Sequence, residues 1–263
     1  MADPVLVDGR TLDIAGVEAV ARIGARAILD DDARARVGDA RQVVEDILAS
    51  GAVVYVINTG FVKLAEVRIS DDQLEQLQLN LLRSHACGVG EPFPEDVVRA
   101  MLLLRANVLA TGHAGCRPLV VERILDLLEA GVHPVVPSQG SVGASGDLAP
   151  LAHLALVLVG EGEALVNGER MSGADALGNV GIEPLHLGAK EGLALINGTQ
   201  ASAAIGALGV ADARRLFDAA DVICALTLDA MGGTDAAFDP AVHAARPHPG
   251  QGASAARLLD LLI

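Results

Sequence analysis

Apolar residues recur every three or four positions through most of the chain, which is the pattern of amphipathic helices. Shorter apolar runs with turn residues beside them predict strands at 5–7 and 52–54, and a hairpin over 161–172. The predicted helices cover 14–23, 33–48, 73–85, 94–111, 118–131, 190–196, 199–231 and 254–263, with 239–251 as loop. The fold class is therefore mainly α, a helical bundle core with a small α/β N-terminal portion.

The helix predicted over 199–231 differs from the others, because apolar residues occupy nearly every face between Ala201 and Val210. Such a helix is normally buried on all sides. A chain of 263 residues can hardly surround it alone, so we expect a homo-oligomeric bundle. We divide the chain into an α/β and helical portion, 1–110, and a portion that begins the central bundle, 111–263.

Composition narrows the class of protein. The formal net charge of −15, without basic clusters, argues against nucleic-acid partners and anionic membranes. No uncharged apolar run reaches the ~18 residues of a membrane span, and the first residues do not form a secretory signal. The three cysteines lie far apart, and His243 and His248 have no further ligands at metal spacing, so we expect no metal and a cytoplasmic location.

The most unusual stretch is the small-residue loop at 140–150, which precedes an apolar segment that reads as a helix. A phosphate-binding loop would need GxxxxGK[ST], but Gly146 is followed by the acidic Asp147. A nucleophile elbow would need GxSxG, and the last glycine is missing after Ser145. The remaining interpretations are an ordinary turn before a helix, or a loop whose own backbone becomes a reagent.

The triad Ala144-Ser145-Gly146, followed by Asp-Leu-Ala-Pro, resembles the prosthetic-group triad of the histidine and aromatic amino acid ammonia-lyases. In that family the triad cyclises autocatalytically to methylidene-imidazolone (MIO), without a metal. The resemblance implies that the Gly146 nitrogen attacks the Ala144 carbonyl carbon, which requires an unhindered nitrogen and a tight bend. Ser145 then loses its hydroxyl as water, leaving an electrophilic methylene at the start of the following helix.

Four further motifs resemble the family in the same order and at familiar separations. They are Tyr55 with Asn58-Thr59-Gly60-Phe61, Ser84-His85-Ala86-Cys87-Gly88-Val89-Gly90, Asn197-Gly198-Thr199-Gln200, and Arg246-Pro247-His248-Pro249-Gly250-Gln251. The resemblance covers essentially the whole chain, and Ser84-His85 favours the histidine branch. It implies an ammonia-lyase/fumarase-like helical architecture, tetrameric in the family.

The resemblance implies a carbon–nitrogen lyase that converts L-histidine to trans-urocanate and ammonia in histidine catabolism. Tyr55 would take the β-proton, which requires its phenolate to be stabilised; Asn197 would position the amino acid, and His85 would contact its imidazole. Taken singly, each residue also has a structural explanation. Tyr55 is then a packed ring, His85 a cap for helix carbonyls, and Asn197 part of a common turn.

Two departures from the family pattern affect the expected activity. Val56 and Val62 stand where the family usually has glycine, so a positive φ at either site would strain the loop around Tyr55. Family members are about twice as long, and the other half supplies a tyrosine, an arginine and an acidic residue. We therefore expect little lyase turnover from a chain truncated at 263. The alternatives are a lyase-inactive structural fragment, and a phenylalanine or tyrosine ammonia-lyase or aminomutase.

Overall fold

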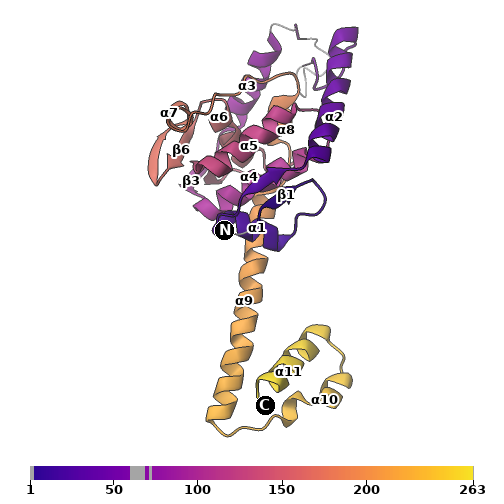
Figure 1. Ribbon diagram of the computed structural model, residues 1–263, viewed down its shortest axis with the longest axis vertical. Helices are drawn as coiled ribbons and strands as arrows, with labels where there is room; N and C mark the ends of the chain where they lie inside the picture. Colours follow the sequence, from indigo (N-terminus) through magenta and orange to yellow (C-terminus); the bar gives the residue numbers. More distant parts are fainter. Residues whose placement is uncertain (1–2, 60–68, 71–72, 263) are drawn as a thin grey trace. The chain divides into compact units, whose positions relative to one another are not determined.

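Helices dominate the computed structural model, which describes residues 3–59, 69–70 and 73–262 (Figure 1). The helices are α1 Ile14–Arg22, α2 Asp31–Ser50, α3 Leu74–His85, α4 Glu95–Leu109, α5 Pro118–Ala130, α6 Leu148–Leu158, α7 Gly173–Asn179, α8 Glu191–Ile196, α9 Gln200–Ala230, the short 3-10 helix η3 Ala236–Phe238, α10 Pro240–Ala244 and α11 Pro249–Leu261. The mainly α prediction is confirmed, and most predicted helices differ from the observed ones by only a few residues.

The chain forms two compact units, Met1–Leu208 and Gly209–Ile263. This division by packing differs from the one drawn from motifs between 110 and 111, which remains a prediction. The core of the first unit is built from α4, α5 and α6, in which Met101, Ile124 and Leu154 are fully buried. Burying a large aliphatic side chain contributes about 1.5–3 kcal/mol, so these helices hold the first unit together.

Helix ends follow local chemistry, with one correction to the sequence prediction. Helix α2 begins at Asp31, two residues before the predicted start at 33, because its cap is Asp30, whose side chain accepts a hydrogen bond from the Ala33 amide. Asp31 and Asp32 follow the cap. Those two carboxylates lie in the first turn, where they interact favourably with the positive end of the helix dipole. The helix ends at Gly51 in the left-handed conformation that glycine tolerates best.

The strands form three small sheets. In the first, β1 Val5–Val7 pairs in parallel with β2 Ala27–Leu29, and in the second β3 Val89–Pro92 pairs antiparallel with β5 Pro137–Gln139. The third sheet has the order β4-β6-β7. It consists of β4 Val132–Pro134, β6 Glu163–Val166 and β7 Glu169–Ser172. The predictions of a strand at 5–7 and of a hairpin within 161–172 are confirmed.

The strand predicted at 52–54 is wrong. The Asn58 side chain accepts a hydrogen bond from the Val54 amide at 2.9 Å and donates one to the Ala52 carbonyl at 2.8 Å. A neighbouring asparagine thus satisfies backbone groups that a partner strand would otherwise bind, which is how such side chains compete with sheet formation. The glycine-rich segment around 88–90 follows the end of α3 and overlaps the start of β3.

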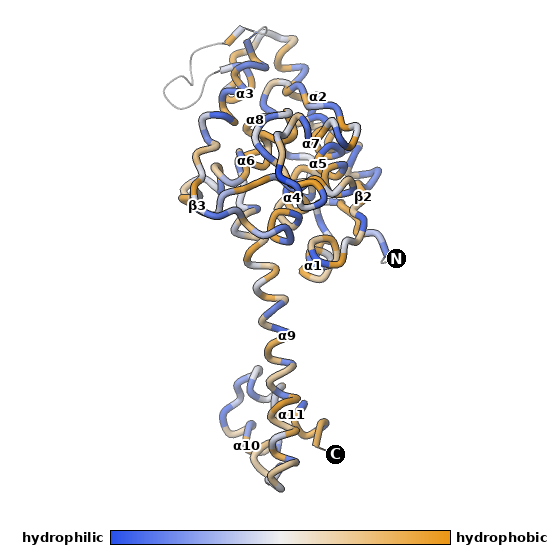
Figure 2. Tube along the Cα trace, turned by 90° about the vertical axis from the view of Figure 1, so that its left-hand side faces the viewer, coloured by the Kyte–Doolittle hydropathy of each residue, from blue (hydrophilic) through white to orange (hydrophobic). Residues whose placement is uncertain are grey.

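In the second unit, helices replace most of the loop predicted at 239–251, because Pro240 and Pro249 occupy first-turn positions where proline favours a helix. Ser254 of α11 donates to Asp221 of α9 at 2.8 Å. Hydrophobic positions recur along α9 (Figure 2), yet Leu216 and Phe217 are both 71% exposed. A single copy of the chain therefore does not bury this helix on all sides.

By length and composition alone, the stretch Glu191–Ala230 is apolar enough to cross a membrane. The criterion is weak support for a membrane span, because long core helices of other proteins meet it equally.

Candidate active site

The small-residue loop connects β5 to α6, and the pairing of β5 with β3 brings the segment after His85 beside it. Val89 of β3 lies opposite Gln139 of β5, immediately before the loop. One residue earlier, the Gly88 amide donates to Nε2 of His153 on α6 at 3.0 Å. This bond requires an unprotonated Nε2, in agreement with burial, which lowers the pKa of His153. Two motifs about fifty residues apart thus become neighbours.

Gly146 is pressed against the turn that joins α8 to α9. Its φ is +116°, and a Cβ placed there would lie 2.5 Å from the Gly198 oxygen and 2.9 Å from the Gly198 nitrogen. The next amide, that of Asp147, donates to the same Gly198 oxygen at 2.6 Å. Only glycine can therefore occupy position 146 without moving the facing backbone.

Asn197 reaches the loop from the same turn. Its Nδ2 donates to the carbonyl oxygen of Ser145 at 2.8 Å. Ala144 and Ser145 are exposed to solvent, whereas Gly146 is buried. The structure therefore brings together the triad and Asn197 from the predicted site, with the serine accessible and the glycine fixed.

Asp147 has a role that the sequence reasoning missed. Its carboxylate is 1% exposed and accepts hydrogen bonds from Ser141 Oγ at 2.6 Å, from the Ser202 amide at 2.8 Å and from Ser202 Oγ at 2.9 Å. Burial raises the pKa of this carboxyl, but the hydrogen bonds outweigh burial and hold the pKa below its usual value. An aspartate before an apolar helix predicts a cap of that helix. Here the side chain instead caps the first turn of α9.

His85 lies in the last turn of α3. Its Nδ1 is 2.8 Å from the Leu81 carbonyl oxygen and 3.1 Å from Ser84 Oγ. A carbonyl can only accept, so this contact assigns the proton to Nδ1. The interpretation of His85 as a cap for helix carbonyls is thus confirmed. In the described part of the chain its Nε2 has no hydrogen-bond partner, so the same ring can also receive a ligand.

Tyr55 lies in the turn after α2 and is 54% exposed. Among the described residues no hydrogen bond joins it to the loop at 140–147. The neighbouring Val56 has a φ of +72° and is buried, and its amide donates to Thr59 Oγ1 at 3.1 Å. The suspected left-handed conformation is therefore present at Val56, where a β-branched residue is strained. Val62, Gly60 and Phe61 lie outside the described residues.

Because Val56 has a left-handed backbone, glycine there should be more stable than alanine, the reverse of the order inside a helix. We expect Val56→Gly to be more stable than Val56→Ala by about 1 kcal/mol, because alanine retains the left-handed penalty and glycine does not. Urea unfolding of the two variants measures the difference. At the buried Val44, inside α2, the same pair should show the opposite order, since glycine weakens a helix interior. The same order at both positions would contradict this account.

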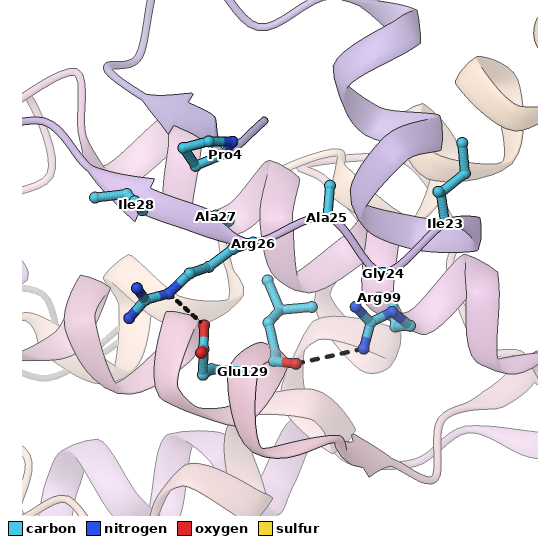
Figure 3. A pocket seen from close by; sticks show the side chains of 10 residues that line it. Pro4, Ile23, Gly24, Ala25, Arg26, Ala27, Ile28, Arg99 and Glu129 are labelled. Atoms are coloured by element: carbon cyan, nitrogen blue, oxygen red, sulfur yellow. Dashed lines mark hydrogen bonds and ion pairs between the residues drawn. The ribbon is translucent and has the colours of Figure 1, made fainter. Parts of the chain in front are cut away.

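A cavity in the described part of the chain lies away from this loop (Figure 3). It measures about 620 Å³ and is lined by Pro4, Ile23, Gly24, Ala25, Arg26, Ala27, Ile28, Arg99, Leu128 and Glu129. Figure 3 shows Arg26 paired with Glu129. Arg99 donates to the Leu128 carbonyl at 3.4 Å, so both guanidinium groups already have partners. No residue of the small-residue loop lines this cavity, and we do not assign the chemistry to it.

The described residues lack a cluster of metal ligands, and one of the three cysteines, Cys116, is buried. The described part of the chain contains no group of three or more His, Cys, Asp or Glu side chains that could hold a metal ion. Burial raises the pKa of Cys116 to about 11, which makes this thiol a poor nucleophile. The loop chemistry is therefore the site's most distinctive feature.

Comparison with known proteins agrees with this geometry. Residues 12–263 match the family described as aromatic amino acid lyase, and the chain belongs to that family. The chain is 55% identical over 254 residues to the histidine ammonia-lyase of Koribacter versatilis, an alignment that covers 97% of the chain and 49% of that relative. The resemblance drawn from the motifs is confirmed.

Solved structures share the fold. Tyrosine aminomutase from Streptomyces globisporus superposes with a TM-score of 0.92 at 39% identity, covering 98% of the chain and 48% of that protein. Histidine ammonia-lyase from Trypanosoma cruzi superposes with a TM-score of 0.91 at 43% identity, covering 97% and 49%. The chain thus spans about half the length of the relatives it matches. The helical architecture predicted from the resemblance is confirmed.

Proposed function

We propose that the chain carries the electrophilic loop of a histidine ammonia-lyase, which converts L-histidine to trans-urocanate and ammonia. The observation that carries the proposal is the clamped triad. Gly146 is bent against Gly198, Asn197 binds the Ser145 carbonyl, and Ser145 remains exposed. Relatives that bear the name histidine ammonia-lyase and reach 55% identity support the substrate. The matching aminomutase structure has lower identity, so it supports the fold more than the reaction.

The residues present fit an MIO group formed from Ala144-Ser145-Gly146. The Gly146 nitrogen forms a bond to the Ala144 carbonyl carbon, and its proton passes to the carbonyl oxygen. The resulting hydroxyl leaves as water with the Ser145 amide proton, giving a C=N bond. The Ser145 α-proton and hydroxyl then leave as a second water, giving the exocyclic methylene. Every atom that is lost is accounted for by these two waters, and no oxidant is needed.

Once formed, the group supplies an electrophile that activates the substrate's amine as a leaving group. The remaining roles fall to side chains of this chain. Asn197, already bound to the Ser145 carbonyl, would orient the amino acid beside the triad. His85 would receive the substrate imidazole N–H at its unpartnered Nε2, since Nδ1 is engaged by Leu81. Tyr55, as its phenolate, would take the β-proton.

The rest of the assignment follows from the family. We propose a cytoplasmic enzyme of histidine catabolism that acts as a homo-oligomer. The exposed apolar residues of α9, among them Leu216, Phe217 and Leu226, support such an assembly, because large exposed apolar surfaces usually mark interaction sites. A lyase-inactive fragment and a related aromatic lyase or aminomutase are the competing outcomes.

Intact mass of the purified chain tests the proposal. We expect a deficit of two waters in the unsubstituted chain, localised by peptide mapping to residues 140–150. Ser145→Ala should lack the dehydration of the serine and therefore lose at most one water. A full sequence mass in the unsubstituted chain would refute ring formation. Urocanate absorbance after addition of L-histidine then separates an active lyase from a cyclised but inactive chain, with L-phenylalanine and L-tyrosine as alternative substrates.

A further inference from the structure

Arg105, in α4, is a buried arginine that the reaction above does not use. It is 2% exposed, and among the described residues it forms no ion pair with a carboxylate. Burial lowers its pKa to about 10, so it remains charged at neutral pH. A buried charge without a counter-ion is costly unless polar groups solvate it, and the groups that solvate Arg105 therefore indicate its role.

All of these groups belong to the end of α8, to the turn that follows and to the first residue of α9. Nη1 donates to Gln200 Oε1 at 2.7 Å and to the Asn197 carbonyl at 3.2 Å. Nη2 donates to the Ala194 carbonyl. Carbonyls at the end of a helix lack partners within the helix and carry its negative dipole end, which favours a cation. The guanidinium thus replaces the missing partners and fixes the turn.

The 197–200 turn also contacts the triad. A Cβ at Gly198 would collide with both Arg105 Nη1 and Gln200 Oε1, so the turn lies directly against the guanidinium. On its other side the same turn binds the loop: Asn197 Nδ2 donates to the Ser145 carbonyl, and the Gly198 carbonyl accepts from the Asp147 amide. Arg105 therefore reaches the loop through a single residue in each case: Asn197, which binds Ser145, and Gly198, which binds Asp147.

We propose that Arg105 is a positioning residue, which holds the 197–200 turn as the rigid surface against which the triad bends for ring closure. The effect on ring closure rests on the proposed function. The hold of Arg105 on the 197–200 turn does not rest on the proposed function, because its contacts are present before any ring forms. Arg105 touches neither the triad nor a substrate, and it acts only through Asn197 and Gly198.

The test compares Arg105→Met and Arg105→Lys with Arg99→Met. Arg99 is a matched control because it lies on the same helix and donates its Nε and Nη2 to the Val20 carbonyl, which is not part of the turn. Two quantities are measured on the whole chain. One is the fraction of chains that have lost two waters at fixed times after cell-free synthesis. The other is amide hydrogen exchange in the peptides spanning 143–150 and 195–203.

In Arg105→Met we expect ring closure about tenfold slower, because misplacing reacting groups by about 1 Å can cost far more. Exchange of the Asp147 amide should rise by a similar factor. Arg105→Lys should lie between this variant and the parent chain, since lysine keeps the charge but not the forked donors. Arg99→Met should change neither quantity, even if its melting temperature falls equally.

Unchanged closure and exchange in a folded Arg105→Met would overturn the proposal. If that variant does not fold, Arg105→Lys decides by the same criteria. If the parent chain shows no loss of water, ring formation and the proposed function fail. The exchange comparison then still decides whether Arg105 clamps the turn.

Discussion

Replacing Gly146 with alanine is expected to abolish ring formation and to lower the free energy of unfolding by about 3 kcal/mol. Two causes add. A methyl group would lie 2.5 Å from the Gly198 oxygen, which is backbone and cannot rotate away, and the φ of +116° is unfavourable for any residue with a Cβ. Intact mass should show no loss of water, and urea unfolding should show the destabilisation.

Gly143→Ala is the matched control from the same loop. Gly143 also has a positive φ, +65°, but a Cβ there would meet no atom within 4 Å. We expect this variant to lose only about 1 kcal/mol and still to cyclise. If Gly143→Ala and Gly146→Ala behaved alike, contact with Gly198 would not be what bends the triad.

Asp147→Asn is expected to destabilise the chain by about 2 kcal/mol at neutral pH. The carboxylate accepts three hydrogen bonds in a buried place, and bonds to a charged group each contribute about 1.5–3 kcal/mol. An asparagine retains the shape, but it loses the charge at the first turn of α9 and offers a donor where an acceptor is needed. Urea unfolding at pH 7 measures the difference.

The stability lost in Asp147→Asn should depend on pH, and the pKa shift of Asp147 gives the direction of that dependence. The folded-state pKa of Asp147 lies below its ordinary value, so its contribution is fully present above the unfolded pKa of about 3.9. The contribution is lost as the pH falls through the lower folded pKa. The difference between the parent chain and Asp147→Asn should therefore stay constant from pH 7 to about 5 and shrink below about 4.

Asp30→Asn provides the comparison for a partly exposed carboxylate that caps its own helix, α2. Asparagine caps helices nearly as well as aspartate, so a change below about 0.5 kcal/mol is expected. An equal cost at both positions would indicate that Asp147 acts only as an ordinary cap, without the buried network to Ser141 and Ser202.

The helices could be predicted because their signals are local. Apolar spacing and the proline that opens α5 specify helix formation within a few residues, and Asn167-Gly168 specifies the hairpin turn. Errors arose where a distant or unexpected partner took part. The 52–54 segment is not a strand because Asn58 binds its backbone, and α2 starts two residues earlier than predicted because Asp30 is the cap.

The candidate site shows the same division between features that the sequence predicts and features that only the tertiary structure decides. The triad could be found in the sequence because ring closure joins three consecutive residues, and the family motifs are contiguous as well. The contacts that bend and hold the triad could not be found there. Gly198, Arg105 and Ser202 lie between about forty and sixty residues from the loop, and no spacing rule connects them with Asp147 or Gly146. Only packing of α4, α6, α8 and α9 brings these groups within hydrogen-bond distance, because the partner of a buried polar group is chosen by proximity in space and not by order along the chain.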